Sequence, residues 1–229
     1  MTSTIIVFGH GPGISDAVAR KFGGEGYRVA LVARGEQRLS AAAAALADEG
    51  IRAEAFACDA GDPEAVRATV RAIREALGPI GVVHWNANAA RAGDVISAAP
   101  DELRTVFDVA VGGLVAAVQE ALPDLESSRG SVLVTGGKFG VDDATIDKTI
   151  VQLDAMGIAL AKSAQHKLAS LLHHKLAPKN VYVGEVVVMA IVKGSAFDAK
   201  GHGTLDPADV AAKFWELSRT RAPFSVRIP

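Results

Sequence analysis

The feature that most limits what this chain can fold into is the regular alternation of short apolar runs with segments of helical periodicity. The runs at 4–8 and 80–85 are apolar nearly throughout rather than at every second position, which predicts strands that are buried on both faces. Between such runs lie helical patterns such as 63–77, which follows Asp62, a favourable N-cap, and stops before Gly78. This alternation favours a parallel sheet that is covered by helices on both faces.

The chain has 229 residues, somewhat more than a typical domain of about 150 residues, and no linker or internal repeat divides it. We therefore expect one domain over residues 1–229, an α/β doubly wound parallel sheet of about seven strands. Segment 138–149 has no clear period and is expected either as a ligand loop after a strand's carboxyl end or as a solvated surface loop. The further strands are expected at 28–33, 52–57, 131–135, 181–188 and 224–228, and the further helices at 16–22, 36–49, 101–122, 150–176 and 207–217.

Charge and composition exclude several classes of protein. Twenty-four basic residues against 26 acidic ones leave a net charge of −2, which gives no electrostatic reason to expect nucleic acid or an anionic membrane as a partner. Cys58 is the single cysteine, so an internal disulfide and a multi-cysteine metal site are excluded, and a reducing cytoplasm is favoured. No run approaches 18 apolar residues and the N-terminus lacks the pattern of a signal peptide, so we expect no membrane span.

The turn after the first strand carries the strongest functional signal. Gly9, Gly11 and Gly13 lie between that strand and the next helix. Glycines allow a tight turn and bring backbone N–H groups close to a pyrophosphate, and the helix N-terminus adds about half a positive charge. In the first strand–turn–helix unit of an alternating chain, this pattern predicts a dinucleotide site. The alternative is a glycine-rich turn that binds no ligand.

Gly9, Gly13 and Ser15 resemble the Gly-x-x-x-Gly-x-Gly motif of the short-chain dehydrogenase/reductase family, with Ser15 in the place of the third glycine. Asp59 resembles the family's aspartate that contacts the adenine, and Asn86 begins a run similar to its Asn-Ala-Gly motif. The resemblance covers nearly the whole chain. It implies a Rossmann-type fold, an NAD(P) cofactor, hydride transfer with an unknown carbonyl or alcohol, and a homodimer or homotetramer. The cofactor-binding residues that it implies are Gly9, Gly11, Gly13, Ile14, Arg34, Asp59, Asn86 and Lys162.

The end of the second strand bears on the choice of cofactor. An acidic residue there would bond the ribose 2′-hydroxyl and repel a 2′-phosphate, but this chain has Ala33 and Arg34. The planar guanidinium of Arg34 can pair with a phosphate, so we expect NADP rather than NAD. NAD stays open, because Pro12 stands where the family often has a basic residue and because Arg34 can equally be a solvated side chain.

The catalytic residues that the resemblance implies are mostly replaced. Members that reduce carbonyls use a tyrosine proton donor, a lysine four residues later, a serine and an asparagine. Lys162 matches the lysine, whereas Ile158 stands at the tyrosine position, Gly137 at the serine position and Ala110 at the asparagine position. A positioned acid is worth about 10²–10⁴ in rate, so its loss slows hydride transfer without forbidding it. Lys162 is the one catalytic residue that we expect.

The missing acid has several candidate substitutes, since Lys138 or Thr135 could hydrogen-bond a substrate oxygen and Asp142 or Asp143 could enter through the loop. His166 lies one helical turn beyond Lys162 and either takes a catalytic role or is a surface histidine like His173 and His174. Three functions stay open: an atypical NADP-dependent oxidoreductase, a non-catalytic NADP(H)-binding sensor or scaffold, and an apo structural protein. The family's substrate lid falls at 189–205. The apolar stripe that an oligomer would use, or that the monomer's own sheet needs, comprises Leu153, Leu160, Ala164, Leu168 and Leu171.

Overall fold

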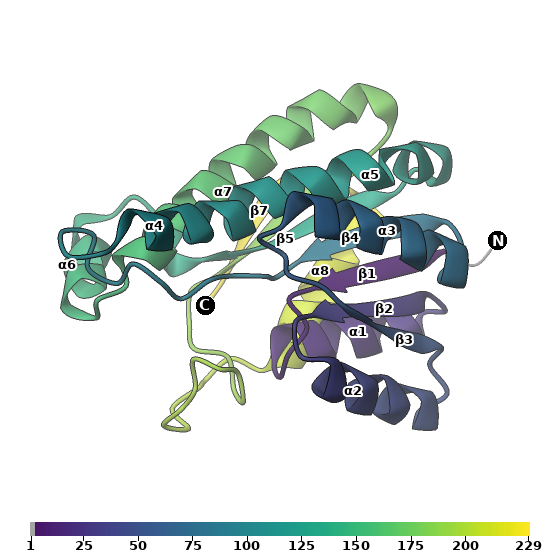
Figure 1. The fold of residues 1–229 in the computed structure, drawn as a ribbon, viewed down its shortest axis with the longest axis horizontal. Coiled ribbons are helices and arrows are strands. Elements are labelled where there is room, and N and C mark those ends of the chain that lie inside the picture. Colours follow the sequence, from purple (N-terminus) through teal and green to yellow (C-terminus); the bar gives the residue numbers. More distant parts are fainter. Residues whose placement is uncertain (1–2) are drawn as a thin grey trace.

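The computed structural model describes residues 3–229, which form a seven-stranded sheet in the order β3-β2-β1-β4-β5-β6-β7 (Figure 1). Every pair of neighbouring strands is parallel. The chain winds outward from β1 to β3 and then from β4 to β7, so the direction of winding reverses between β1 and β4, where sheets of this kind bind ligands. The predicted doubly wound α/β fold is confirmed. The strands are β1 Thr4–Phe8, β2 Arg28–Ala33, β3 Ala53–Ala57, β4 Ile80–Trp85, β5 Ser131–Gly137, β6 Tyr182–Val188 and β7 Ser225–Ile228.

Helices cover both faces of the sheet. In Figure 1, α3, α5 and α7 lie above the strands, whereas α1 and α2 lie below them, and α8 packs against α1. Each group seals one apolar cluster against the sheet. The helices are α1 Ile14–Gly24, α2 Glu36–Asp48, α3 Pro63–Leu77, α4 Pro100–Phe107, the π-helical η1 Asp108–Gly112, α5 Gly113–Ser128, the 3₁₀ turn η2 Lys138–Gly140, α6 Ala144–Gln152, α7 Met156–Leu176, the 3₁₀ turn η3 Ala177–Lys179 and α8 Pro207–Thr220.

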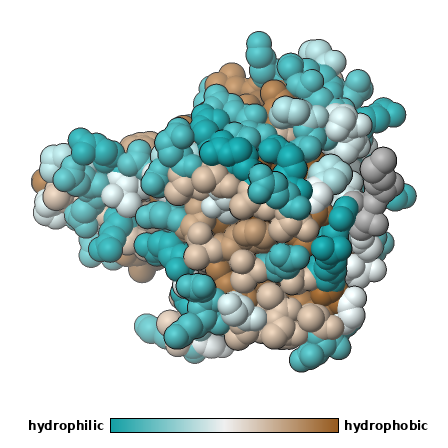
Figure 2. All heavy atoms as spheres, turned by 45° about the vertical axis from the view of Figure 1, so that its right-hand side comes forward, coloured by the Kyte–Doolittle hydropathy of each residue, from teal (hydrophilic) through white to brown (hydrophobic). Residues whose placement is uncertain are grey.

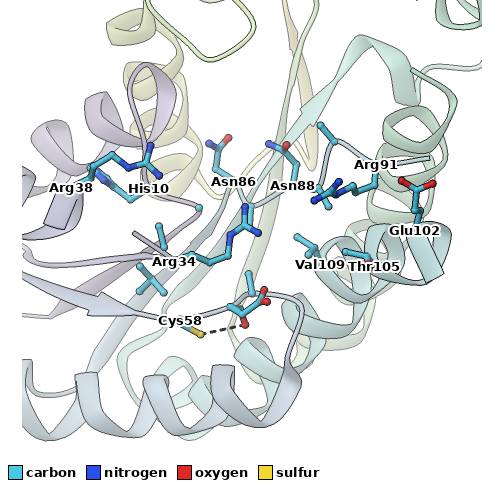
Figure 3. Close-up of a pocket in the computed structure, with 18 of the residues that line it drawn as sticks. His10, Arg34, Arg38, Cys58, Asn86, Asn88, Arg91, Glu102, Thr105 and Val109 are labelled. Carbon is cyan, nitrogen blue, oxygen red and sulfur yellow. Dashed lines mark hydrogen bonds between the residues drawn. The ribbon is translucent and has the colours of Figure 1, made fainter. Parts of the chain in front are cut away.

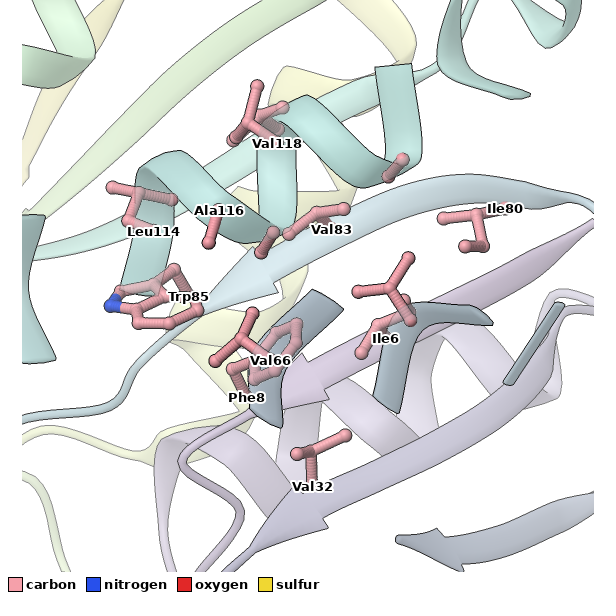
Figure 4. Packing of buried hydrophobic residues seen from close by; sticks show 14 of the residues in the cluster. Ile6, Phe8, Val32, Val66, Ile80, Val83, Trp85, Leu114, Ala116 and Val118 are labelled. Carbon is pink, nitrogen blue, oxygen red and sulfur yellow. The ribbon is translucent and has the colours of Figure 1, made fainter. Parts of the chain in front are cut away.

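The packing around Trp85 fixes the edge of the sheet that faces the candidate site. Trp85 ends β4 and is fully buried, and its ring centroid lies 4.7 Å from that of Phe8 at the end of β1. Leu114 from α5 and Val66 from α3 belong to the same cluster, as Figure 4 shows. Fully burying one large apolar side chain contributes about 1.5–3 kcal/mol. The ends of β1 and β4 are therefore held rigidly beside the loops that follow them.

The helix expected at 101–122 is divided into three parts, and its expected end is wrong. α4 passes into the π-helical turn η1, and α5 then continues beyond Pro123 to Ser128. A π-turn inserts an extra residue and shifts the helical phase, but residues 109–118 are all apolar or glycine, so periodicity does not reveal the shift. The helix passes Pro123 because Leu125 on the next turn is fully buried and extends the apolar face.

The expectations for residues 138–176 also need correction. Residues 144–149, expected as part of a loop, form α6 together with residues 150–152, and the long helix begins at Met156 rather than at residue 150. The carboxylate of Asp143 caps α6 by accepting hydrogen bonds from the backbone N–H groups of Thr145 and Ile146. A left-handed residue, Asp154 with φ of 48°, separates the two helices. Capping and backbone geometry, rather than apolar periodicity, therefore define this segment.

One helical segment among residues 3–229, Pro100–Ser128, is long and apolar enough by length and composition to cross a membrane. Half of its most apolar stretch is buried inside the protein, where α5 packs against β4 and α3. The sequence expectation missed this segment because it required an uninterrupted apolar run. In the structure, these apolar residues cover one face of the sheet.

The alanine-rich helix α2 is amphipathic only through two leucines. Leu39 and Leu46, seven residues apart, are its buried residues, whereas Ala41, Ala44 and Ala45 are exposed. Alanine has the highest helix propensity, which explains why the run is helical without much burial. Figure 2, turned by 45° from Figure 1 so that its right-hand side comes forward, shows a continuous apolar area across the middle and lower part of the visible face, bordered by hydrophilic residues.

Candidate functional site

A cleft of about 640 Å³ opens at the carboxyl ends of β1, β2 and β4 (Figure 3). It lies at the reversal of winding described above. Of the residues predicted to bind a cofactor, Gly9, Arg34, Asp59 and Asn86 line this cleft. Gly11, Gly13 and Ile14 belong to the turn beside it and to the start of α1. Lys162 does not line it and lies elsewhere. The other lining residues are His10, Val32, Ala33, Arg38, Cys58, Ala60, Ala87, Asn88, Ala89, Ala90, Arg91, Asp101, Glu102, Thr105 and Val109.

The glycine turn has the backbone that its sequence predicts. Gly9 has φ of 75°, and a Cβ atom there would lie 2.4 Å from the backbone nitrogen of Ala87. Gly13 has φ of 89° and is the N-cap of α1. The hydroxyl of Ser15 donates to the carbonyl of Gly9 over 3.0 Å and accepts from Nδ2 of Asn86 over 2.7 Å. The hydrogen bonds of Ser15 therefore link the turn to the loop after β4.

Two arginines give the cleft a basic end next to β2. Arg34 directly follows β2, and Arg38 lies in the first turn of α2. Both side chains line the cleft. In Figure 3 the side chain of Arg34 points into the middle of the cleft. The guanidinium of Arg38 folds back toward Gly35, where a Cβ atom would lie 3.1 Å from its Nε. Sequence reasoning missed Arg38, although its place at the start of the helix after β2, close to Arg34 in the chain, was a usable signal.

The loop between β6 and α8 covers the other side of the glycine turn. A Cβ atom on Gly13 would lie 3.1 Å from Cβ of Ser195, so this loop packs directly against the turn. Asp198 closes the loop on itself by accepting the N–H groups of Gly194 over 3.0 Å and Gly203 over 2.7 Å. These backbone hydrogen bonds hold the pKa of Asp198 below its ordinary value. The segment in which the resemblance places a substrate lid is thus a loop that packs against the glycine turn.

Lys162 is held away from the large cleft by two acceptors. Its ammonium donates to the carbonyl of Thr135 over 2.7 Å and to Oε1 of Gln165 over 3.0 Å. Nε2 of Gln165, a buried side chain, donates in turn to the carbonyl of Ala110 in η1 over 3.2 Å. Through these hydrogen bonds Gln165 links Lys162 to Ala110, the position at which the resemblance expects an asparagine. Sequence reasoning missed Gln165, whose only signal is a polar residue on the buried stripe of α7.

A second cavity of about 320 Å³ lies beside Lys162, at the carboxyl ends of β5 and β6. In it a half-exposed histidine contacts a buried acid, since Nδ1 of His166 lies 2.6 Å from Oε2 of Glu185. The hydroxyl of Ser225 donates to the same oxygen over 3.0 Å. The lining residues are Gly137, Gly140, Val141, Asp142, Lys162, His166, Glu185, Val187, Ser225 and Arg227.

The remaining candidates for proton chemistry are engaged in packing. The hydroxyl of Tyr182 donates to the carbonyl of Pro223 over 2.6 Å, and burial raises its pKa to about 12. The ring of Tyr27 packs against Phe22 and Trp215. His84 is fully buried with Nε2 3.2 Å from Oγ1 of Thr135, and burial lowers its pKa to about 3, so it stays neutral. None of these side chains faces either cavity.

The buried ammonium of Lys162 gives a testable pH dependence. Burial lowers its pKa from 10.5 to about 8, against the opposing charge of Glu185. Between these two values the unfolded chain binds more protons than the folded one, so this group's contribution to stability rises with pH. Relative to the Lys162→Met variant, the unfolding free energy of the natural protein should increase by about 2 kcal/mol from pH 7 to pH 10.

Urea unfolding of both proteins at several pH values measures this difference. Lys167→Met, which removes an exposed lysine from the next turn of the same helix, controls for the loss of one charge. A difference between natural protein and Lys162→Met that stays constant over this range would show that the ammonium is not buried.

Comparison with known proteins gives four findings. A family model described as short chain dehydrogenase matches residues 3–200. Meso-2,3-butanediol dehydrogenase of Serratia marcescens is 32% identical over 137 residues, which are 60% of this chain and 54% of that protein, so the chain spans about half the length of this relative. An uncharacterised oxidoreductase of Staphylococcus aureus is 26% identical over 211 residues, 90% of this chain and 86% of that protein. A metagenomic short-chain oxidoreductase in complex with NADP is 22% identical, with a TM-score of 0.81 over 100% of this chain and 97% of that one.

Proposed function

Because the chain belongs to the short-chain dehydrogenase family, we propose that it is an oxidoreductase that moves a hydride between NADP(H) and a small carbonyl or alcohol. The observation that carries this proposal is the large cleft, where the glycine turn, the helix N-terminus and two arginines meet at the reversal of winding. The matched family and its dehydrogenase relative support the same reaction type.

The residues of the cleft fit a dinucleotide. At Gly11 an added Cβ atom would meet nothing within 4 Å, so the turn leaves open space where a pyrophosphate would lie. Gly9, Gly11, Gly13 and Ile14 would hold that pyrophosphate at the N-terminus of α1. Asp59 and Asn86 would contact the adenosine part. A bound NADP(H) supplies or accepts the hydride, and the protein's part is to position it and to handle the proton.

The two arginines favour NADP over NAD. Arg34 and Arg38 place two guanidinium groups near the N-terminus of α2, which suits a doubly charged 2′-phosphate. The residue directly after β2 is Arg34, not a carboxylate that would repel that phosphate. The solved neighbour described above binds NADP, in agreement with this choice.

A second function has a specific observation in its favour. Ile158, Gly137 and Ala110 remove three proton-handling side chains that the resemblance expects. A protein that binds NADP(H) without turnover, as a sensor or scaffold, would also have this composition. The two functions share the cofactor site and differ only in whether a substrate is converted.

Titration of NADPH fluorescence with the purified protein tests both functions. We expect NADPH to bind about tenfold or more tightly than NADH, because charge-assisted hydrogen bonds contribute about 1.5–3 kcal/mol each. A panel of small ketones and secondary alcohols then separates the two. Tight binding without turnover would reject the oxidoreductase in favour of the sensor, and absence of binding at millimolar NADPH would reject both.

We also propose that the protein works in the cytoplasm as a homodimer or homotetramer. Of the apolar stripe expected on the long helix, Leu168 packs into the core, whereas Leu153, Leu160 and Leu171 are exposed by 61%, 42% and 57%. Leu160 and Leu171 lie about three turns apart on the same face of α7, which suits association with a second copy, whereas Leu153 lies before α7, at the end of α6. Sedimentation velocity of the purified chain decides this proposal, and a monomer at tens of micromolar would reject it.

A further inference from the structure

The second cavity lies where the resemblance expects the substrate. Gly137 and Lys162, which stand at the serine and lysine positions of the expected catalytic set, both line it, and neither lines the large cleft. Ile158, at the tyrosine position, contributes no proton. The volume of about 320 Å³ is at the lower end of ligand pockets. The cavity therefore suits a small molecule and lacks the usual acid.

Glu185 is a buried acid in an otherwise apolar strand. Its side chain is 1% exposed, with Oε2 bound by His166 and Ser225. Its second oxygen, Oε1, has no hydrogen-bond partner among the described residues. Gly136 leaves room for it, since a Cβ atom there would lie 2.6 Å from Oε1. Burying a carboxylate costs free energy unless it is paired. In this strand the pairing is the contact with His166.

The carboxylate fixes the orientation of the His166 ring. An ionised carboxylate only accepts hydrogen bonds, so Nδ1 of His166 carries the proton of this pair. Nε2 is then the ring nitrogen that remains for a ligand. The side chain is 47% exposed, so Nε2 can exchange its proton with water.

The charged groups around this ring are balanced. Lys162 lies on the same helix, Glu185 on β6, Arg227 on β7 and Asp142 after η2, and all four line the cavity with His166. Two are basic and two are acidic. A neutral polar substrate such as a hydroxyketone is therefore better suited to this cavity than an ion.

We propose that His166, oriented by Glu185, is the acid–base residue of this enzyme and that the second cavity takes a small ketone or secondary alcohol. This inference rests on the proposed oxidoreductase function. During reduction the carbonyl carbon accepts a hydride, which is the chemistry that bound NADPH supplies. The carbonyl oxygen takes the proton from Nε2 of His166, leaving a neutral imidazole whose Nδ1–H still donates to Glu185. The imidazole recovers a proton from water, and the buried ammonium of Lys162 stabilises the negative charge that grows on the oxygen.

Kinetics of the His166→Asn variant test this role, with acetoin and NADPH as the reactants. We expect kcat/KM to fall about 100-fold or more, while the dissociation constant for NADPH stays within about twofold of the natural value. His174→Asn, which replaces an exposed histidine two turns further along the same helix, should leave the rate unchanged. Added imidazole should restore part of the activity of His166→Gly.

A readout without turnover comes from carbethoxylation of histidines by diethyl pyrocarbonate, followed by mass spectrometry. Meso-2,3-butanediol should protect His166 and leave His174 unprotected. Equal rates for the two asparagine variants, or absence of protection, would overturn the role of His166 while the oxidoreductase function stands. NADPH binding without turnover of acetoin or of the wider panel would overturn the function itself and this role with it.

Discussion

Gly113→Ala should destabilise the protein by about 2 kcal/mol or more, although the same change in an ordinary helix stabilises it by about 1 kcal/mol. Gly113 begins α5 and is buried, and an added Cβ atom would lie 1.9 Å from the carbonyl oxygen of Ala60 and 2.9 Å from Cη2 of Trp85. Neither neighbour can yield cheaply, because one is backbone and the other is a fully buried indole. The added methyl group must therefore push α5 off the sheet.

Thermal and urea unfolding measure this effect, and the adjacent glycine supplies the control. A Cβ atom on Gly112 would meet only Cγ of Pro63, at 3.9 Å, so Gly112→Ala should be neutral or slightly stabilising. The expected loss in Gly113→Ala corresponds to a fall in Tm of roughly 4–8 °C, since 1 kcal/mol shifts Tm by about 2–4 °C in a domain of this size. Equal stability of the two variants would mean that α5 does not pack this closely against the loop after β3.

The Gly113→Ala variant should also affect the cofactor cleft. Ala60 lies between Asp59, which is expected to contact the adenosine part, and Gly61, whose N–H donates to the Asp59 carboxylate over 2.9 Å. A displaced Ala60 should move that carboxylate, so Gly113→Ala should also weaken NADPH binding at temperatures where the variant is folded. Stability and cofactor affinity are thus coupled through one backbone contact.

The sequence predicted the parts of this fold that local patterns encode. β1, β4 and α3 have the predicted bounds, and Asp62 caps α3 by accepting the N–H groups of Glu64 and Ala65. Apolar runs and caps are local signals, so they can be interpreted without knowing the tertiary structure. The turn at Gly9 was predicted for the same reason, because its positive φ and close approach to Ala87 demand glycine in any chain with this connection.

The parts that were missed depend on contacts between distant segments. The π-turn η1 has an ordinary helical pattern, and its role becomes visible only when Gln165, 55 residues away, donates to the carbonyl of Ala110. Glu185 and His166 lie 19 residues apart in different elements. A glutamate within the strand 181–188 was nevertheless a signal that could have been used, since a buried acid requires a partner. The direction of the Lys162 side chain had no sequence signal.

Arg34→Asp should lower the affinity for NADPH by about 100-fold or more. The variant should then bind NADH as tightly as NADPH or more tightly. Arg34 is the first residue after β2 and points into the cleft (Figure 3). An aspartate at this place removes a guanidinium, worth about 1.5–3 kcal/mol in a charge-assisted hydrogen bond, and adds repulsion against a doubly charged 2′-phosphate. It also offers a carboxylate to the free 2′-hydroxyl of NADH. Arg38→Ala should produce a smaller loss, because α2's N-terminus and Arg34 remain.

Fluorescence titrations with both dinucleotides at two salt concentrations measure this switch. Arg52→Asp changes the net charge by the same amount at an exposed position before β3, at the opposite end of the strands, and should leave the ratio of the two affinities unchanged. Because the loss reflects a charge at short range, it should persist in part at 0.5 M salt, where the Debye length is only about 4 Å. If Arg34→Asp and Arg52→Asp gave the same ratio of NADPH to NADH affinity, Arg34 would be a solvated side chain and the basic end of the cleft would have no part in choosing the cofactor.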